Sequence, residues 1–172
     1  MGTRNNISVV IDNDIMVHQY GQWDGYPSGQ GQDIVNFLTT CDLDTFKAKV
    51  RKLKQYTPKA VEKIECSYSS KGTFNSISDD EWQKLIEDHP ELTRDSGSRI
   101  LGHIQSGKVK KVVFTDFTDT GCFGIEWSYL IDLDHNSLWV FKNGTMVDGE
   151  LVKEIPFKNL KRSMKALIKK YC

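Results

Sequence analysis

Residues 8–20, Ser8-Val-Val-Ile-Asp-Asn-Asp-Ile-Met-Val-His-Gln-Tyr20, form the stretch that decides how this chain begins to fold. Two runs rich in β-branched residues flank Asp12-Asn-Asp14, whose side chains tolerate a positive φ. Alternation along the second run places His18 and Tyr20 on one side of the strand and Val17 on the other. The pattern predicts a β-hairpin at the N-terminus.

The remaining elements come in blocks, with helices in the middle of the chain and strands in its last third. Helix starts are marked by Asp44, by Thr57-Pro58 and by the capping box Ser78-Asp-Asp-Glu81. Asn143-Gly144 is typical of a hairpin turn. The expected helices span residues 33–38, 44–53, 57–64, 78–86, 99–105 and 160–171, and the later strands span 109–114, 123–133, 138–142 and 151–155.

This order of elements predicts an α+β fold. Hairpins near both ends of the chain favour a mainly antiparallel sheet, on which the intervening helices must pack. With 172 residues, 38% of them apolar and 27% charged, the chain is expected to form one domain over residues 1–172.

Charge and hydropathy narrow the classes of partner. Lys+Arg and Asp+Glu both number 23, so the formal net charge is zero, and we expect neither DNA nor RNA as a partner. Any nucleic-acid role would need a local basic patch. No apolar run approaches the roughly 20 residues that a membrane span needs. The four cysteines are scattered and no secretory leader precedes them, so we expect a cytoplasmic protein with reduced thiols.

The most distinctive polar segment follows the hairpin: Tyr20-Gly-Gln-Trp-Asp-Gly-Tyr-Pro-Ser-Gly-Gln-Gly31. Its glycines let the backbone adopt a positive φ and approach a ligand closely, and it leads into a helix N-terminus that attracts anions. It supplies three aromatic rings, an amide and a carboxylate, from Tyr20, Trp23, Tyr26, Gln22 and Asp24. We expect a nucleotide-like ligand here, whereas the alternative interpretation makes Trp23 and Tyr26 core residues beneath a long loop.

Two further segments carry candidate residues. The first is Arg94-Asp-Ser-Gly-Ser-Arg99 with His103. Arg99 and His103 lie four apart in an expected helix and share a face, where they could bind phosphate or protonate a leaving group. Alternatively they belong to a solvated helix. Glu126 follows Asp116 and Asp119, and a carboxylate in so apolar a strand suggests an inward group suited to acid–base chemistry.

No metal site and no cofactor is expected. Asp132-Leu-Asp-His-Asn136 imitates the start of a calcium loop, but Ser137 replaces the required glycine and Asn143 the required glutamate. We interpret residues 134–137 as a turn between strands. The histidines and cysteines lack metal-ligand spacing, and no Gly-Lys-Ser/Thr follows the glycine-rich loop, which excludes a phosphate-loop nucleotide triphosphatase.

The opening Met1-Gly-Thr-Arg4 and the string Tyr20-Gly-Gln-Trp-Asp-Gly-Tyr-Pro27, with Gly29 and Gly31, resemble a family of small uncharacterised proteins of bacteriophages, bacteria and fungi. The resemblance is specific over the first 40 residues and looser around residues 126–132. It implies a phage-type accessory protein. One class of such proteins disarms bacterial immunity by sequestering or cleaving nucleotide second messengers, an analogy of gene type and pocket chemistry.

From this resemblance we expect a protein that binds a cyclic oligonucleotide or an ADP-ribose derivative in the host cytosol. Trp23 or Tyr26 would stack on the base. Asp24 and Gln22 would contact ribose or base, beside Tyr20. The phosphates would be bound by Arg4 and Arg99. A homodimer is expected, because signal-binding proteins of this size often build pockets between subunits.

Whether the ligand is also cleaved is left open by the sequence. A cleaving enzyme would be a metal-independent hydrolase of the phosphodiesterase type. Its acid–base groups would come from His18, His103, Asp24 and Glu126.

Two other classes of function stay open. The N-terminal strand and hairpin resemble the layering of N-terminal-nucleophile amidohydrolases, but Gly2 carries no nucleophile and Thr3 would need a further cleavage. The chain could instead be an interaction protein that docks on a host enzyme and blocks it.

Overall fold

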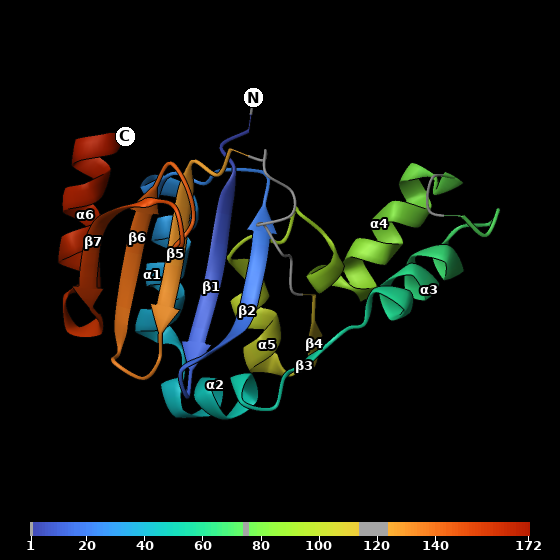
Figure 1. The fold of residues 1–172 in the computed structure, drawn as a ribbon, viewed down its shortest axis with the longest axis horizontal. Helices are drawn as coiled ribbons and strands as arrows, with labels where there is room; N and C mark the ends of the chain where they lie inside the picture. The colour runs from blue at the N-terminus through green and yellow to red at the C-terminus, as the bar shows by residue number, and fades with distance from the viewer. Residues whose placement is uncertain (1, 74–75, 114–123) are drawn as a thin grey trace.

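The computed structural model describes residues 2–73, 76–113 and 124–172, and its centre is a five-stranded sheet (Figure 1). The strand order is β2 (Asp14–Gly21), β1 (Asn5–Ile11), β5 (Trp127–Asp132), β6 (Ser137–Lys142) and β7 (Glu150–Pro156). Only the β1–β5 pair is parallel within this sheet. The expected α+β class and mainly antiparallel sheet are therefore confirmed, while the layering of N-terminal-nucleophile hydrolases stays a prediction.

The N-terminal hairpin forms as the sequence predicts. Asp12 and Asn13 adopt positive φ values of 55° and 65°, the pair of left-handed residues that a two-residue hairpin turn requires. A register shift between Val9 and Val10 adds one residue to β2, but His18 and Tyr20 still lie on the same side.

Helices cover one face of the sheet, and within the described residues no helix layer lies on the other face (Figure 1). The covering helices are α1 (Gln32–Thr40), α2 (Leu43–Val50), α5 (Arg99–Ser106) and α6 (Leu160–Tyr171). Alternate residues of the central strands point into this core, among them Ile7, Val9, Tyr129 and Ile131, each completely buried. Burial of such side chains contributes about 1.5–3 kcal/mol each and holds the two layers together.

Helix ends follow the predicted caps with one exception. The Ser78 capping box is complete, Thr57 accepts a hydrogen bond from the Ala60 N–H, and Gly107 ends α5 at φ 80°. At α2 the cap is Asp42 rather than Asp44, because its side chain accepts from the N–H of Thr45.

The expected strand 109–114 is shorter than predicted and lies outside the main sheet. Its described part, β4 (Lys111–Val112), pairs in parallel with β3 (Lys54–Gln55). Beyond this ribbon, α3 (Pro58–Tyr68) and α4 (Asp79–Asp88) pack on one another to one side of the sheet (Figure 1). Within the described residues no helix is long and apolar enough to cross a bilayer.

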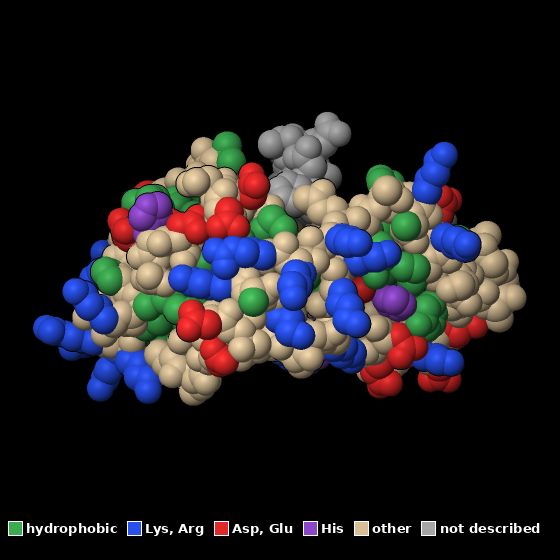
Figure 2. All heavy atoms as spheres, turned by 90° about the horizontal axis from the view of Figure 1, so that it is seen from below, with side chains coloured by type: hydrophobic (Ala, Val, Ile, Leu, Met, Phe, Trp, Pro, Cys, Tyr) green, Lys and Arg blue, Asp and Glu red, His purple; other side chains and the backbone are tan. Residues whose placement is uncertain are grey.

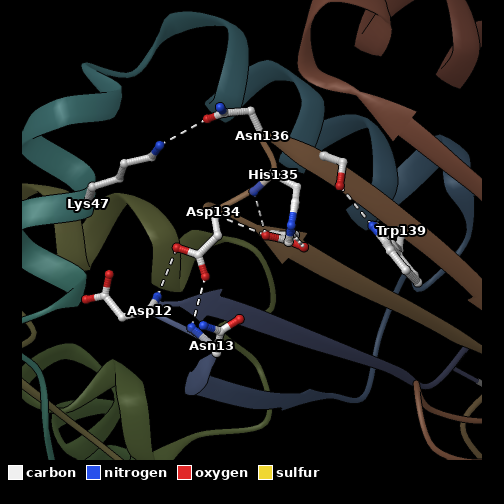
Figure 3. A network of polar contacts seen from close by, with 9 residues as sticks. Asp12, Asn13, Lys47, Asp134, His135, Asn136 and Trp139 are labelled. Atoms are coloured by element: carbon white, nitrogen blue, oxygen red, sulfur yellow. Dashed lines mark hydrogen bonds and ion pairs between the residues drawn. The ribbon is translucent and has the colours of Figure 1, made fainter.

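The two hairpin turns at the lower edge of the sheet are joined by a polar network (Figure 3). Asp134 accepts hydrogen bonds from the N–H groups of Asp12 and Asn13 at 2.9 and 3.0 Å. Asp132 accepts from the N–H groups of the turn after it and lies 2.8 Å from His135 Nδ1. The predicted strand-to-strand turn is present, but it spans residues 133–136, because Ser137 already pairs with Asp132 as the first residue of β6.

Candidate functional site

The glycine-rich segment lies across the upper end of β1 and β2, where it is tied to the first residues of the chain. The Gly25 N–H donates to the Thr3 carbonyl at 3.0 Å, and Asn5 Nδ2 donates to the Trp23 carbonyl at 3.0 Å. Asn5 is completely buried. The segment is therefore part of the hairpin's own framework and not a detached loop.

A second anchor reaches the segment from the core. The hydroxyl of Tyr129, on β5, donates to the Gly25 carbonyl at 2.8 Å. Tyr129 is fully buried, and this burial raises the pKa of its phenol well above the ordinary value. A neutral phenol is the form that donates, so the bond persists over the physiological pH range.

The turn after Gly25 depends on a close backbone approach. Asp24 adopts φ 53°, and its carbonyl accepts from the Gln30 N–H at 2.8 Å. A Cβ at Gly29 would lie 2.3 Å from that carbonyl oxygen. Glycine is thus required at residue 29 for steric reasons.

Tertiary structure brings the second candidate segment against the first. Gln22 N–H donates to the Arg94 carbonyl at 3.1 Å, Trp23 Nε1 donates to Asp95 Oδ1 at 2.8 Å, and Ser98 N–H donates to Gln30 Oε1 at 2.6 Å. Residues 20–31 and 94–98 therefore form one surface, the 20–31/94–98 surface. The sequence analysis included Arg94 and Asp95 in its second candidate segment but assigned roles only to Arg99 and His103, since nothing local shows which side chains face the first segment.

Two aromatic rings stand out from this surface. Trp23 is 50% exposed and Tyr26 is 44% exposed, although the backbone around them is hydrogen bonded to its surroundings. The alternative interpretation of both as core residues is therefore wrong. Asp24 is also exposed, and within the described part of the chain its carboxylate makes no hydrogen bond.

Arginines lie beside these groups. The Tyr20 hydroxyl donates to Gln22 Oε1 at 2.6 Å, and burial raises the pKa of the Tyr20 phenol while the positive charges of Arg4 and Arg94 act in the opposite direction. The N-terminal residues that carry Arg4 are held to the segment of Tyr20 and Gln22 by the Gly25–Thr3 hydrogen bond.

A buried polar cluster continues from Tyr20 down the side of the sheet without helices. Ser8 Oγ lies 2.8 Å from His18 Nδ1, and Asn6 Nδ2 donates to Ser8 Oγ at 3.0 Å. The exposed fractions of Asn6, Ser8 and His18 are 1%, 2% and 7%. The expectation for His18 did not include its neighbours, because polar residues at alternate positions of one strand are unremarkable in the sequence.

Arg99 and His103 are placed differently from the expectation. The guanidinium of Arg99 donates to the carbonyls of Asp95 and Ser96 and so caps its own turn. His103 lies one turn further along α5, where burial chiefly, then the charges of Lys108 and Arg99, lower its pKa. In the described residues no hydrogen bond or ion pair joins the His103 ring to the 20–31/94–98 surface, so a joint acid–base role with the loop stays a prediction.

Glu126 is exposed and precedes β5, so the expectation of an inward carboxylate is wrong. Its Oε1 accepts from the Arg4 N–H at 3.4 Å, and its own N–H donates to the Arg4 carbonyl at 3.1 Å. These contacts place Glu126 beside Arg4 at the edge of the surface. Asp116 and Asp119 lie outside the described residues.

Neither a metal-binding cluster in the described residues nor a similar known protein indicates a function for this chain. Among the side chains that the structure describes, no three His, Cys, Asp or Glu residues are grouped as a metal site would require. Comparison with known proteins found no matching family model, no matching curated protein and no matching solved structure. A function for this chain must therefore be inferred from the geometry of the surface and from the resemblance in the first 40 residues.

Proposed function

We propose that this chain binds a small nucleotide-like ligand on the 20–31/94–98 surface. The observation that carries the proposal is Trp23, a large ring that is half exposed and yet fixed at its indole N–H and at its own carbonyl. A ring held in water by such bonds is preorganised for stacking. Stacking of one base on an aromatic side chain is worth about 1–3 kcal/mol.

The polar groups around Trp23 suit the rest of a nucleotide. The exposed carboxylate of Asp24 can accept hydrogen bonds from ribose hydroxyls, and Gln22 can pair with a base edge. The side chains of Arg4 and Arg94 supply positive charge for phosphate. Arg94 takes the role expected of Arg99, whose guanidinium is engaged with backbone carbonyls.

Sequestration is favoured over cleavage. Among the four catalytic candidates, His103 has no hydrogen bond or ion pair with the surface in the described residues, and His18 is buried beside Ser8. Asp24 and Glu126 are exposed carboxylates, and Glu126 accepts a hydrogen bond from the Arg4 N–H. The resemblance to phage accessory proteins makes cyclic oligonucleotides and ADP-ribose derivatives the first ligands to test.

The test is thermal unfolding of the chain against a panel of these nucleotides, with each ligand recovered afterwards and analysed by mass spectrometry. A ligand at a hundred-fold excess over its Kd stabilises the folded state by about 2.7 kcal/mol. Stabilisation with intact ligand supports a sequestering protein, and stabilisation with ligand loss supports a hydrolase. No stabilisation and no loss across the panel would refute the proposal.

Two variants of Trp23 separate stacking from anchoring. Trp23→Ala removes the ring, so we expect the affinity to fall by about 1–3 kcal/mol. Trp23→Phe keeps a stacking face and loses only the bond to Asp95, so a smaller effect is expected. Trp139→Ala on β6 is the matched control, because that indole bonds to Ser137 and does not touch the surface.

A further inference from the structure

Positive charge gathers on the underside of the molecule, well away from the 20–31/94–98 surface. Figure 2 shows Lys and Arg side chains across the middle of this face. Two short segments that meet where β3 pairs with β4 carry five basic residues, in 47–54, and three, in 108–111, together eight of the chain's 23 basic residues. We call this set the basic face: Lys47, Lys49, Arg51, Lys52, Lys54, Lys108, Lys110 and Lys111.

The fold forces these two segments together. β3 and β4 pair in parallel with Lys54 directly beside Lys111, and the Lys54 N–H donates to the Lys110 carbonyl at 3.2 Å. On the neighbouring helix end, a Cβ at Gly107 would lie only 3.0 Å from Lys49 Nζ. Lys54 and Lys111 carry like charges on neighbouring strands, and the repulsion between them lowers the stability of the fold.

Little within the described residues compensates this repulsion. Among the ion pairs of the described residues, one involves the basic face, between Arg51 and Asp12 at 2.8 Å. Lys47 and Lys108 donate to an amide oxygen and a backbone carbonyl, and Lys111 lies 5.3 Å from the centre of the Tyr56 ring. Four exposed lysines have no anionic partner in the part of the chain that the structure describes: Lys49, Lys52, Lys54 and Lys110.

The composition of the basic face favours a phosphate backbone over a protein partner. Protein interfaces depend on buried aromatic or apolar anchors, and the exposed large apolar side chains of the described residues, Trp23, Tyr26, Val147 and Leu151, all lie elsewhere. Lysine acts as a point charge for phosphate, and the face offers no free guanidinium fork with which to recognise a base. Contacts of this kind bind nucleic acid without reading its sequence.

We propose that the basic face binds the phosphate backbone of a nucleic acid without sequence preference. The expectation of no DNA or RNA partner followed from the net charge of zero, with a local basic patch as the stated condition for any nucleic-acid role, and the basic face is such a patch. This inference is independent of the proposed nucleotide site.

The experiment measures binding of a short fluorescein-labelled DNA duplex and of its single strand by anisotropy, over a series of salt concentrations. The test variant carries K49Q, K52Q, K54Q and K110Q. The matched control carries K158Q, K161Q, K165Q and K169Q, which remove the same charge from exposed positions at and along α6. A third variant replaces the four test lysines with arginine, which keeps the charge.

Wild type is expected to bind less tightly as salt rises. If all four lysines contact phosphates, the test variant should have a log–log salt slope shallower by about 3–4. The control and the arginine variant should keep the wild-type slope, and Trp23→Ala should bind DNA normally even if it fails to bind nucleotides. Thermal unfolding of each variant checks that it is folded.

Three outcomes would overturn the inference. The first is no binding of either DNA at low salt. The second is an equal loss of affinity in the test and control variants, which would indicate net charge alone. The third is tighter binding of labelled polyglutamate or of phosphatidylserine vesicles than of DNA through the same four lysines, which would assign the face to an acidic protein or a membrane.

Discussion

The indole Nε1 of Trp23 donates a 2.8 Å hydrogen bond to Oδ1 of Asp95, 72 residues further along the chain. This bond joins the glycine-rich segment to the turn before α5 and holds the ring half exposed. The relative position of the two segments is not encoded within either of them, because it depends on hydrogen bonds between residues 20–31 and 94–98.

A double-mutant cycle should detect this bond in the stability of the chain. Trp23→Phe and Asp95→Ala should each lower the free energy of unfolding by about 0.5–1.5 kcal/mol, and together by less than the sum. Urea unfolding measures all four proteins. Trp139→Phe combined with Asp95→Ala is the control and should be additive; strict additivity of the Trp23 pair would contradict the prediction.

Two glycine substitutions should act in opposite directions. Gly29→Ala places a Cβ 2.3 Å from the Asp24 carbonyl oxygen, so the turn must shift and stability should fall by about 1–3 kcal/mol. Gly102→Ala, in the middle of α5 with no atom within 4 Å of the added Cβ, should raise stability by about 0.5–1 kcal/mol. Thermal midpoints of the two variants test the pair, and a stabilising Gly29→Ala would show that the turn is not constrained.

Tyr129→Phe should destabilise the protein by about 1–3 kcal/mol, because the buried Gly25 carbonyl loses its donor. Tyr129→Phe should also weaken ligand binding, since residues 20–31 lose their hydrogen bond to β5. Tyr68→Phe removes an exposed bond to Asp88 and should change stability by less than about 0.5 kcal/mol. Equal effects of the two substitutions in chemical unfolding would argue against Tyr129 as an anchor.

Two histidines outside the proposed site, His135 and His103, should give pH effects of opposite sign. The hydrogen bond to Asp132, then its charge, raises the pKa of His135, so its stabilisation is present below the ordinary value near 6.5 and is lost as pH rises through the folded-state pKa. Burial chiefly lowers the pKa of His103, so its stabilisation is present above 6.5 and is lost as pH falls through the folded-state pKa.

Unfolding measured from about pH 5 to 8 tests this difference. His135→Gln should lose stability relative to wild type mainly at the acid end, and His103→Gln mainly at the alkaline end. A pH dependence of the same sign in both variants would be inconsistent with the opposite environments of the two rings.

Local signals predicted most elements of the fold. The Ser78 capping box and the Thr57 cap gave correct helix starts because each cap needs only residues within one turn. The N-cap of α2 was wrongly predicted as Asp44 instead of Asp42, because two aspartates two residues apart offer equivalent hydrogen-bond acceptors. The β1–β5 pairing was not predicted, because it joins Ile7 to Tyr129 across the length of the chain.

Some residues of the candidate site were identified from the sequence, and others became apparent only in the structure. Trp23, Asp24 and Tyr26 were identified from a polar, glycine-rich segment, and the structure leaves all three exposed. Arg94 lay in the second candidate segment without an assigned role, and the neighbours of His18 were missed, since the relevance of both depends on contacts across strands and loops. Glu126 was misplaced because an apolar strand pattern does not show where pairing begins.

The sequence by itself determined the hairpin, the helix caps, the α+β class and the position of the glycine-rich segment, because short-range periodicity and turn chemistry encode these features. Only the tertiary structure decided that residues 94–98 complete this segment and that eight cations share one face of a chain with no net charge. Both results come from strand pairing and core packing between distant residues. Such contacts are selected by burial of the whole core, and no local pattern records them.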